Sequence, residues 1–386
     1  MFSGETCFEK LFKCPLLDFI MNVHSLINNA VNSIKGTEGK KKSIAGKLNA
    51  LKKEKLAKFN SKELIEEDFF YSLNPAELNH KIVGTDSGFV GKRMHSIDII
   101  LVKTVSAFFS YKKGKLIKAD YFPSPTDFPK PFISSNVLEN DEFLCNKSLL
   151  RLKEEISCSK KAIEKFQPDY CFIDGSIIPQ YADKPRKDSE LNSEYSGLIK
   201  LFESLYETAE KNSCNLIATV EDSRGSRFRS ILQKEILSKT NSVESDDLNS
   251  FFDSSLLDYL LSKNQRSFCF NYTSSIKEHP ILNDFNEKWA SKVKVFYLKP
   301  SLLDRPLRIE FLHNGKELTS HCNEIASVVL SLSCLHKEYA YPSILIEADL
   351  RARLKPNEVE ILFNKIQDKL GRENAFMALR RNSRPF

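Results

Sequence analysis

The sequence lacks any hydrophobic run long enough to cross a membrane, since no stretch approaches the roughly 18 apolar residues that a spanning helix needs. The first 27 residues mix acidic with apolar positions, which is a poor match to a secretory signal. The nine cysteines are scattered and form no C-x-x-C pair, which argues against a zinc cage and suits free thiols in a reducing compartment. These absences predict a cytoplasmic protein with no membrane contact.

Signatures of enzymes that carry their own nucleophile or phosphate loop are also missing. There is no G-x-S-x-G elbow, no Walker A loop and no ligand spacing among the seven histidines. Charge is abundant instead, with 28% charged residues and a net charge of +6. Eight lysines and one acid lie between Lys40 and Lys58, and the C-terminal end from Arg372 is basic. A solvated helix face explains the lysine run most simply, and contact with nucleic-acid phosphates is the functional alternative.

Periodicity predicts an α/β protein with a mixed sheet. Residues 16–79 look helical, and strand-like runs follow at 81–90, 97–110 and 115–122. The last two are separated by the turn signal Lys112-Lys-Gly-Lys115. Four prolines make residues 123–132 a loop. Helices and strands then alternate, with helices over about 142–166 and 189–212 and strands over 170–174 and 215–221.

The second half continues with further helices and strands. We expect a loop over 241–249, a helix over 251–261, strands near 267–272, 293–299 and 307–313, a helix over 319–336, an acid-bearing strand ending at Asp349, and a terminal helix from Pro356. The predicted organisation is an N-terminal helical region (1–80), a core (81–353) with an insertion around 240–340, and a C-terminal helix with a basic tail (354–386).

Acids at the ends of separate apolar runs are the most informative feature. Asp86 follows Ile82-Val83, Asp174 ends Tyr170-Cys-Phe-Ile-Asp, and Asp349 closes Tyr341-Pro-Ser-Ile-Leu-Ile-Glu-Ala-Asp. Carboxylates that converge from several strand ends are typical of a site for hard cations, which prefer oxygen ligands. Strand-end acids also serve as helix caps, so each acid taken alone is weak evidence.

A helix acid strengthens the hypothesis. Helical geometry puts Glu155 at the edge of the apolar face that Leu152 belongs to, from where it can reach neighbouring strand ends. Glu154 lies farther toward solvent and is the weaker choice. Strand acid, helix acid, strand acid and late acid form the ribonuclease H-like arrangement. In such sites two metal ions about 3.5–4 Å apart hold the attacking and leaving oxygens of a phosphodiester.

The ordered motifs make the chain resemble the NurA family of nucleases. The matching pieces include Gly84-Thr-Asp-Ser-Gly88, the helix carrying Glu155, Phe172-Ile-Asp-Gly-Ser176, Ala218-Thr-Val-Glu-Asp-Ser-Arg224, Leu256-Leu-Asp-Tyr-Leu260, Arg308-Ile-Glu310 and Tyr341–Asp349. The resemblance implies a ribonuclease H-like mixed sheet flanked by helices, with an N-terminal helical segment and C-terminal additions. It also implies Asp86, Glu155, Asp174 and Asp349 as metal ligands.

The same resemblance implies an activity and partners. These are manganese-dependent cleavage of single-stranded DNA, with magnesium as the alternative ion, and 5′-to-3′ exonuclease action on duplex ends during double-strand break repair by homologous recombination. A homodimer working beside a HerA-type hexameric ATPase is also implied. The apolar N-terminal helix and the 251–261 segment are candidate ATPase contacts. Two positions depart from the family, because some members have histidine at Asp349 and many have lysine at Glu221-Asp222, which here we interpret as a helix cap.

Basic residues near these motifs are candidates for phosphate contact. They are Lys92, Arg93, Arg224, Arg227, Arg351 and Arg353. Arg308 and Glu310 lie on one strand face and are simplest to interpret as a structural ion pair. Two other functions remain open at this point, a non-catalytic nucleic-acid-binding scaffold and a ribonuclease or transposase relative with the same core.

Overall fold

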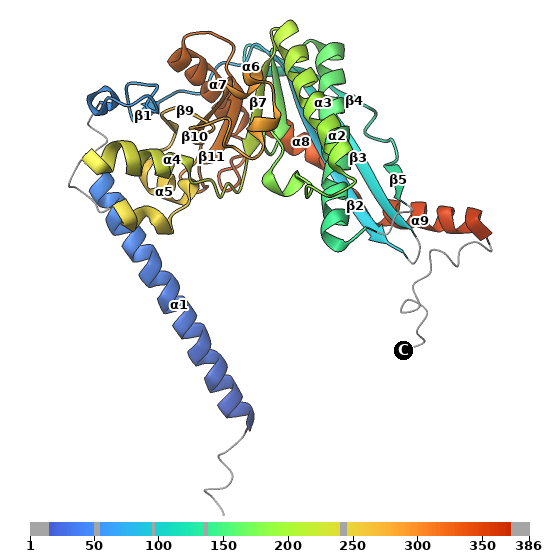
Figure 1. The fold of residues 1–386 in the computed structure, drawn as a ribbon, viewed down its shortest axis with the longest axis horizontal. Coiled ribbons are helices and arrows are strands. Elements are labelled where there is room, and N and C mark those ends of the chain that lie inside the picture. Colours follow the sequence, from blue (N-terminus) through green and yellow to red (C-terminus); the bar gives the residue numbers. More distant parts are fainter. Residues whose placement is uncertain (1–14, 50–54, 95–96, 135–137, 240–244, 372–386) are drawn as a thin grey trace, which may run out of the picture.

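The structure is a computed structural model that describes residues 15–49, 55–94, 97–134, 138–239 and 245–371 (Figure 1). Its centre is a single 11-stranded sheet with the spatial order β1-β8-β10-β11-β7-β6-β2-β3-β4, to which β5 adds on β3 and β9 on β10. In chain order the strands are β1 (Phe70–Ser72), β2 (Lys81–Arg93), β3 (Asp98–Lys112), β4 (Lys115–Phe122), β5 (Lys130–Ser134), β6 (Tyr170–Asp174), β7 (Asn215–Val220), β8 (Gln265–Ser267), β9 (Phe270–Asn271), β10 (Val293–Lys299) and β11 (Leu307–Leu312).

Five strands carry the predicted mixed topology. β2, β3 and β4 form an antiparallel meander, whereas β6 pairs parallel to β2 and β7 pairs parallel to β6. β5 pairs antiparallel with β3, and the other strands extend the sheet from β7 through an antiparallel β11. The α/β fold class expected from the sequence is therefore confirmed, with a mixed sheet flanked by helices.

The predicted hairpin between β3 and β4 is confirmed in position and in turn chemistry. Lys112 pairs with Lys115, and the two residues between them, Lys113 and Gly114, have φ values of 51° and 70°. Two successive left-handed residues make the tight turn whose twist matches that of the flanking strands. Glycine occupies one of these positions because it has no Cβ to clash there.

Helices cover both faces of the sheet. α2 (Asn140–Phe166) and α3 (Asn192–Lys211) pack on one face, and α7 (Leu318–Leu332) and α8 (Ser343–Ala352) on the other. Successive side chains of β2 point to opposite faces of the sheet. Val83 packs in the hydrophobic core with α2 and α3, and Ile82 packs in the core with α7 and α8. The other helices are α1 (Pro15–Leu48), α4 (Arg227–Ile231), α5 (Asp253–Leu260), α6 (Glu287–Ala290) and α9 (Pro356–Leu370), with a π turn at Leu232–Ile236 and short 3₁₀ turns elsewhere.

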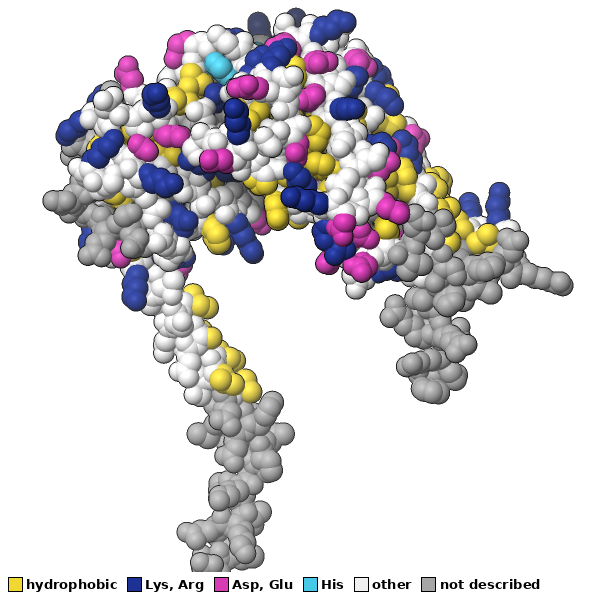
Figure 2. Space-filling view, in the orientation of Figure 1, with side chains coloured by type: hydrophobic (Ala, Val, Ile, Leu, Met, Phe, Trp, Pro, Cys, Tyr) yellow, Lys and Arg dark blue, Asp and Glu magenta, His cyan; other side chains and the backbone are white. Residues whose placement is uncertain are grey.

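The N-terminal helix α1 projects from the body of the molecule (Figure 1) and carries exposed apolar side chains, visible as the yellow surface along it in Figure 2. Those exposed by more than a third are Val23, Leu26, Ile27, Val31 and Ile34. The helical expectation for residues 16–79 holds only as far as Leu48. Residues 55–80 contain a 3₁₀ turn, η2 (Leu56–Phe59), and the short strand β1, so the prediction was wrong for this stretch.

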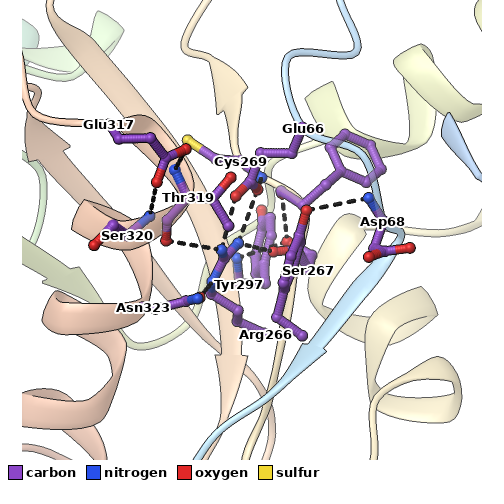
Figure 3. A network of polar contacts seen from close by, with 12 residues as sticks. Glu66, Asp68, Arg266, Ser267, Cys269, Tyr297, Glu317, Thr319, Ser320 and Asn323 are labelled. Carbon is purple, nitrogen blue, oxygen red and sulfur yellow. Dashed lines mark hydrogen bonds and ion pairs between the residues drawn. The ribbon is translucent and has the colours of Figure 1, made fainter. Parts of the chain in front are cut away.

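A buried ion pair ties that stretch to the sheet (Figure 3). Both Arg266, on β8, and Glu66 have fully buried side chains, and two hydrogen bonds of 2.8 and 2.7 Å join them. Arg266 also donates to Asn323 on α7 and lies 4.0 Å from the centre of the Tyr71 ring. Because every polar group in this network is paired, the charges can be buried without an unmet desolvation cost.

Three further strand expectations need correction. β2 covers the predicted run 81–90, but it does not end at the acid Asp86 and continues to Arg93, because β3 supplies a partner over its whole length. The predicted loop 123–132 ends in an edge strand, β5, where Pro131 is tolerated because an edge residue needs no second ladder bond. Asp349 lies in helix α8 rather than at the end of a strand.

The reason for the α8 error is visible in its packing. Ile344, Leu345, Ala348 and Ala352 are buried at helical spacing, and short apolar runs do not distinguish a strand from a buried helix.

Seven cysteines lie in the described residues, all of them free and six of them buried. None of the described helices combines the length and hydrophobicity needed to cross a bilayer.

Candidate metal centre

The predicted acids lie near the point where β6 ends and the adjacent strand β2 continues unpaired on that side. Thr85 pairs with Ile173, so Asp86 and Asp174 are the next residues of two adjacent parallel strands. Asp174 is the last residue of β6, and Gly175, with φ of 91°, turns the chain away. Asp86 is buried in the middle of β2. The topology thus places two carboxyl groups side by side at a sheet edge.

Glu155 approaches this edge from α2. Its side chain is fully buried, and Glu155 Oε2 accepts a 3.3 Å hydrogen bond from Ser87 Oγ and a 2.9 Å hydrogen bond from Arg151 Nη1. Glu154 instead forms an ion pair of 2.5 Å with Lys130 at the surface. The geometry therefore favours Glu155 over Glu154 as the member of the acid cluster.

Asp349 reaches the same edge from α8, which lies unusually close to β2. A Cβ on Gly88 would fall 2.4 Å from the Ala352 carbonyl oxygen, and one on Gly84 would fall 2.8 Å from Ile344 Cγ1. Only glycine at these positions lets the helix backbone approach the strand this closely. The Asp349 carboxylate is exposed, and it is near enough to raise the pKa of both Asp86 and Asp174.

The electrostatics of the cluster show crowded negative charge. Burial raises the pKa of Asp86, and repulsion from Asp174 and Glu155 raises it further. Burial also raises the pKa of Asp174, although the Tyr341 hydroxyl and Arg151 oppose that shift. For Glu155 burial raises the pKa and the Arg151 charge lowers it. Carboxyl groups in such a site hold protons unless a cation replaces them.

These residues fit a divalent cation. Glu155 Oε1 is buried without a hydrogen-bond partner, so one oxygen of the cluster is free to act as a ligand. Carboxylate oxygens are the donors that manganese and magnesium prefer. In the described part of the chain no three acidic, histidine or cysteine side chains lie in positions that could hold a metal ion as they stand. An ion would therefore have to draw the carboxylates together.

Two partners of the cluster escaped the sequence prediction. Arg151 lies four residues before Glu155, a spacing that places both on one helix face and could have revealed it. The Tyr341 hydroxyl donates to Asp174 Oδ1 and lies 2.8 Å from the Thr219 carbonyl oxygen. This contact joins residues 167 positions apart, so only the tertiary fold reveals it.

The turn after Asp174 is held from β11, which lies on the far side of β7 from β6. Glu310 Oε2 accepts hydrogen bonds from Ser176 Oγ (2.6 Å) and from the Ile177 amide (3.0 Å). Arg308 Nε donates to the other oxygen of Glu310 at 2.6 Å, and both side chains are buried. The structural ion pair expected for Arg308 and Glu310 is confirmed. It holds the backbone next to Asp174 in place.

The six basic candidates are dispersed around this centre. Lys92 is exposed farther along β2, whereas Arg93 is committed to Asn140, the Leu138 carbonyl and Asp98. Arg224 and Arg227 line a cavity of about 630 Å³ beyond β7, and Arg227 also pairs with Glu63.

The last two candidates belong to α8 and its end. Arg351 pairs with Glu347 at 2.8 Å, and Arg353 is exposed just after the helix.

Glu221, which we interpreted as a cap, accepts a hydrogen bond from Tyr339 and has a pKa raised by burial and by the nearby Asp174. Glu221 therefore borders the acid cluster.

Comparison with known proteins gives one matching family and structures of similar fold. The sequence profile of the NurA domain matches residues 80–354. The NurA nuclease from Sulfolobus solfataricus has a similar structure, with a TM-score of 0.54 and 17% identity over 93% of this chain and 98% of that one. A structure of NurA with manganese has a TM-score of 0.51 and 11% identity, covering 91% and 100% of the two chains. No curated protein sequence matches the chain significantly.

Proposed function

The chain belongs to the NurA family, and on that premise we propose that it is a metal-dependent deoxyribonuclease. The observation that carries the proposal is the convergence of Asp86, Glu155, Asp174 and Asp349 on one sheet edge, where their charges repel one another. Such a cluster has little use in a protein that binds DNA passively, because its carboxylates would repel the phosphates.

We infer that Mn²⁺ occupies the centre, with Mg²⁺ as the alternative, and that the four acids are its ligands. The manganese in the related NurA structure supports this assignment. When bound, the metal supplies an activated water and neutralises charge on the leaving oxygen.

The chain's own residues orient the ligands. Arg151 and Ser87 hold Glu155 Oε2, which leaves Oε1 free for the ion. Tyr341 fixes Asp174, and Glu310 fixes the turn that follows. Such outer partners of metal ligands set the ligand orientation and charge state.

The substrate and partners are finer proposals. We propose cleavage of single-stranded DNA and 5′-to-3′ degradation from duplex ends in double-strand break repair in the cytoplasm. The enzyme would act as a homodimer with a HerA-type hexameric ATPase. The exposed apolar side chains of α1 support a protein contact there. The 251–261 segment is a poorer contact, because Leu256, Leu257 and Leu260 are buried in the core.

The test is degradation of labelled single-stranded DNA with Mn²⁺, compared with chelated protein and with Asp86→Ala. We expect cleavage by the wild type and loss in the variant. Tight DNA binding by the wild type without any cleavage would favour a non-catalytic scaffold. A matched RNA substrate distinguishes a ribonuclease relative, which would cleave RNA at least as well as DNA.

A further inference from the structure

Beside the acid cluster, every second residue of strand β2 lies against every fourth residue of helix α2. Ser87 contacts Glu155, and Phe89 contacts Arg151. A Cβ at Gly91 would fall 2.8 Å from Phe143 Cζ and 3.1 Å from Lys147 Cδ, so the Lys147 side chain passes next to Gly91. Two strand residues span about 6.6 Å and four helix residues about 6 Å, so the two elements keep this match along their length. Along this contact between β2 and α2, the residues that follow Glu155 are therefore Arg151, Phe89 and Lys147.

Phe89 is exposed in spite of its size. Its exposed fraction is 39%, although it follows Asp86 by only three positions on the same strand. The Lys147 ammonium lies 5.2 Å and the Arg151 guanidinium 5.6 Å from the centre of its ring. An accessible aromatic ring flanked by two cations is the combination that proteins use to bind single-stranded nucleic acid.

Both cations have binding capacity to spare. Among the described residues Lys147 has no hydrogen bond or ion pair, and Arg151 uses one of its five N–H donors on Glu155. Arginine and lysine are the side chains that bind phosphate best, arginine with two parallel hydrogen bonds.

An open groove begins at Phe89 and follows the edge of β2 that β6 leaves unpaired. It has a volume of about 660 Å³ and is lined by Phe89, Gly91 and Lys92 on one side and by Phe363 of α9 on the other. The Lys92 ammonium lies 4.6 Å from the centre of the Phe363 ring. The groove therefore continues the alternation of aromatic rings and positive charges away from the acids.

We propose that Phe89, Lys147 and Arg151 form a subsite for one unpaired nucleotide of the DNA strand, with its base stacked on Phe89 and a phosphate bound by Lys147 and Arg151. The inference rests on the proposed nuclease function and deepens it. A base in a duplex is already stacked and paired, so it cannot lie on Phe89. The subsite thus selects single-stranded DNA next to the metal centre.

The test measures binding rather than cleavage, in full-length Asp86→Asn protein. Its ligands are a fluorescein-labelled oligothymidylate and an abasic oligonucleotide of equal length, followed by fluorescence anisotropy. We expect Phe89→Leu to raise the Kd for oligothymidylate roughly tenfold and to leave the abasic Kd within about twofold. Phe89→Tyr should bind like the parent, because it keeps a ring.

Two further variants complete the design. Lys147→Ala should weaken both oligonucleotides equally and lower the slope of log Kd against log salt concentration by about one. Phe128→Leu is the matched control, since Phe128 is 61% exposed but lines a different cavity beside Pro123, and it should change neither Kd.

Three results would overturn the subsite. They are no binding of oligothymidylate by the parent, no effect of Phe89→Leu, or an equal loss for both oligonucleotides. A wild-type protein that fails to cleave DNA would instead refute the nuclease proposal and leave these binding results interpretable.

Discussion

Arg151 donates a 2.9 Å hydrogen bond from Nη1 to Glu155 Oε2, one turn along the same helix, and it is the positive charge that lowers the pKa of both Glu155 and Asp174. One cation thus opposes the repulsion within a cluster of four acids. The balance is incomplete, because the pKa values of Glu155 and Asp174 stay raised. A bound divalent cation would correct this imbalance.

Neighbouring glutamates on α2 should behave differently when neutralised. Glu155→Gln removes a fully buried carboxylate of the cluster, and we expect DNA cleavage with Mn²⁺ to fall by at least about a hundredfold. Glu154→Gln only breaks a surface ion pair with Lys130, so its activity should stay within about twofold. Initial rates on labelled single-stranded DNA make the comparison. Equal losses in both variants would contradict the assignment of Glu155.

The metal-free protein should become less stable as the pH rises. The folded pKa of Asp86 is raised to about 8 and that of Glu155 to about 7, while both groups lose their protons near pH 4 in the unfolded chain. Between pH 4 and 8 the unfolded state therefore binds fewer protons, so unfolding becomes more favourable with rising pH. We expect Tm with EDTA to drop on the order of 5 °C from pH 5.5 to 8.

Mn²⁺ and Asp86→Asn should each reduce this pH dependence. The ion replaces the protons, so the rise in Tm that it causes should be larger at pH 8 than at pH 5.5. Asp86→Asn removes one repelling charge, so its metal-free Tm should exceed that of the wild type at pH 8. A metal-free wild-type Tm that stays constant or rises between pH 5.5 and 8 would contradict the interpretation that the acids of the cluster repel one another.

Tyr341 should tune the metal requirement. Tyr341→Phe deletes the hydroxyl that binds Asp174, and we expect the Mn²⁺ concentration for half-maximal activity to rise about 10- to 100-fold. Tyr339→Phe is the matched control, because its ring lies 5.7 Å from that of Tyr341 but its hydroxyl binds Glu221. Metal titrations of cleavage distinguish them, and the same shift in both variants would argue against a specific role for Tyr341.

The Arg266–Glu66 pair should dominate the stability of the N-terminal segment. Arg266→Met leaves the Glu66 carboxylate buried and unpaired (Figure 3), and we expect a loss of about 3–5 kcal/mol in the free energy of unfolding by urea. Replacing both residues with apolar ones should recover most of it. Lys288→Met breaks an exposed pair with Glu210 and should cost at most about 1 kcal/mol. Comparable losses for the buried and exposed pairs would contradict the prediction.

Local patterns in the sequence predicted much of the fold. The hairpin at Lys113-Gly114, the helix α2 and the strand β6 each have a period or a turn signal within a few residues, so neighbours along the chain decide them. The acids Asp86, Glu155 and Asp174 were identifiable because each stands at a fixed place in such a pattern. The helix register also favoured Glu155 over Glu154, which its burial agrees with.

Tertiary contacts decided the rest. Asp349 sits on a helix because Ile344 and Ala352 fit against Gly84 and Gly88, a match between distant segments that no local pattern encodes. The same holds for the Tyr341 contact with Asp174 and for the alignment of Phe89 with Arg151. The sequence determined which side chains have the chemistry to bind metal and phosphate. Packing of the sheet against α2 and α8 decided which of them share a site, because distance and burial arise only when the chain is folded.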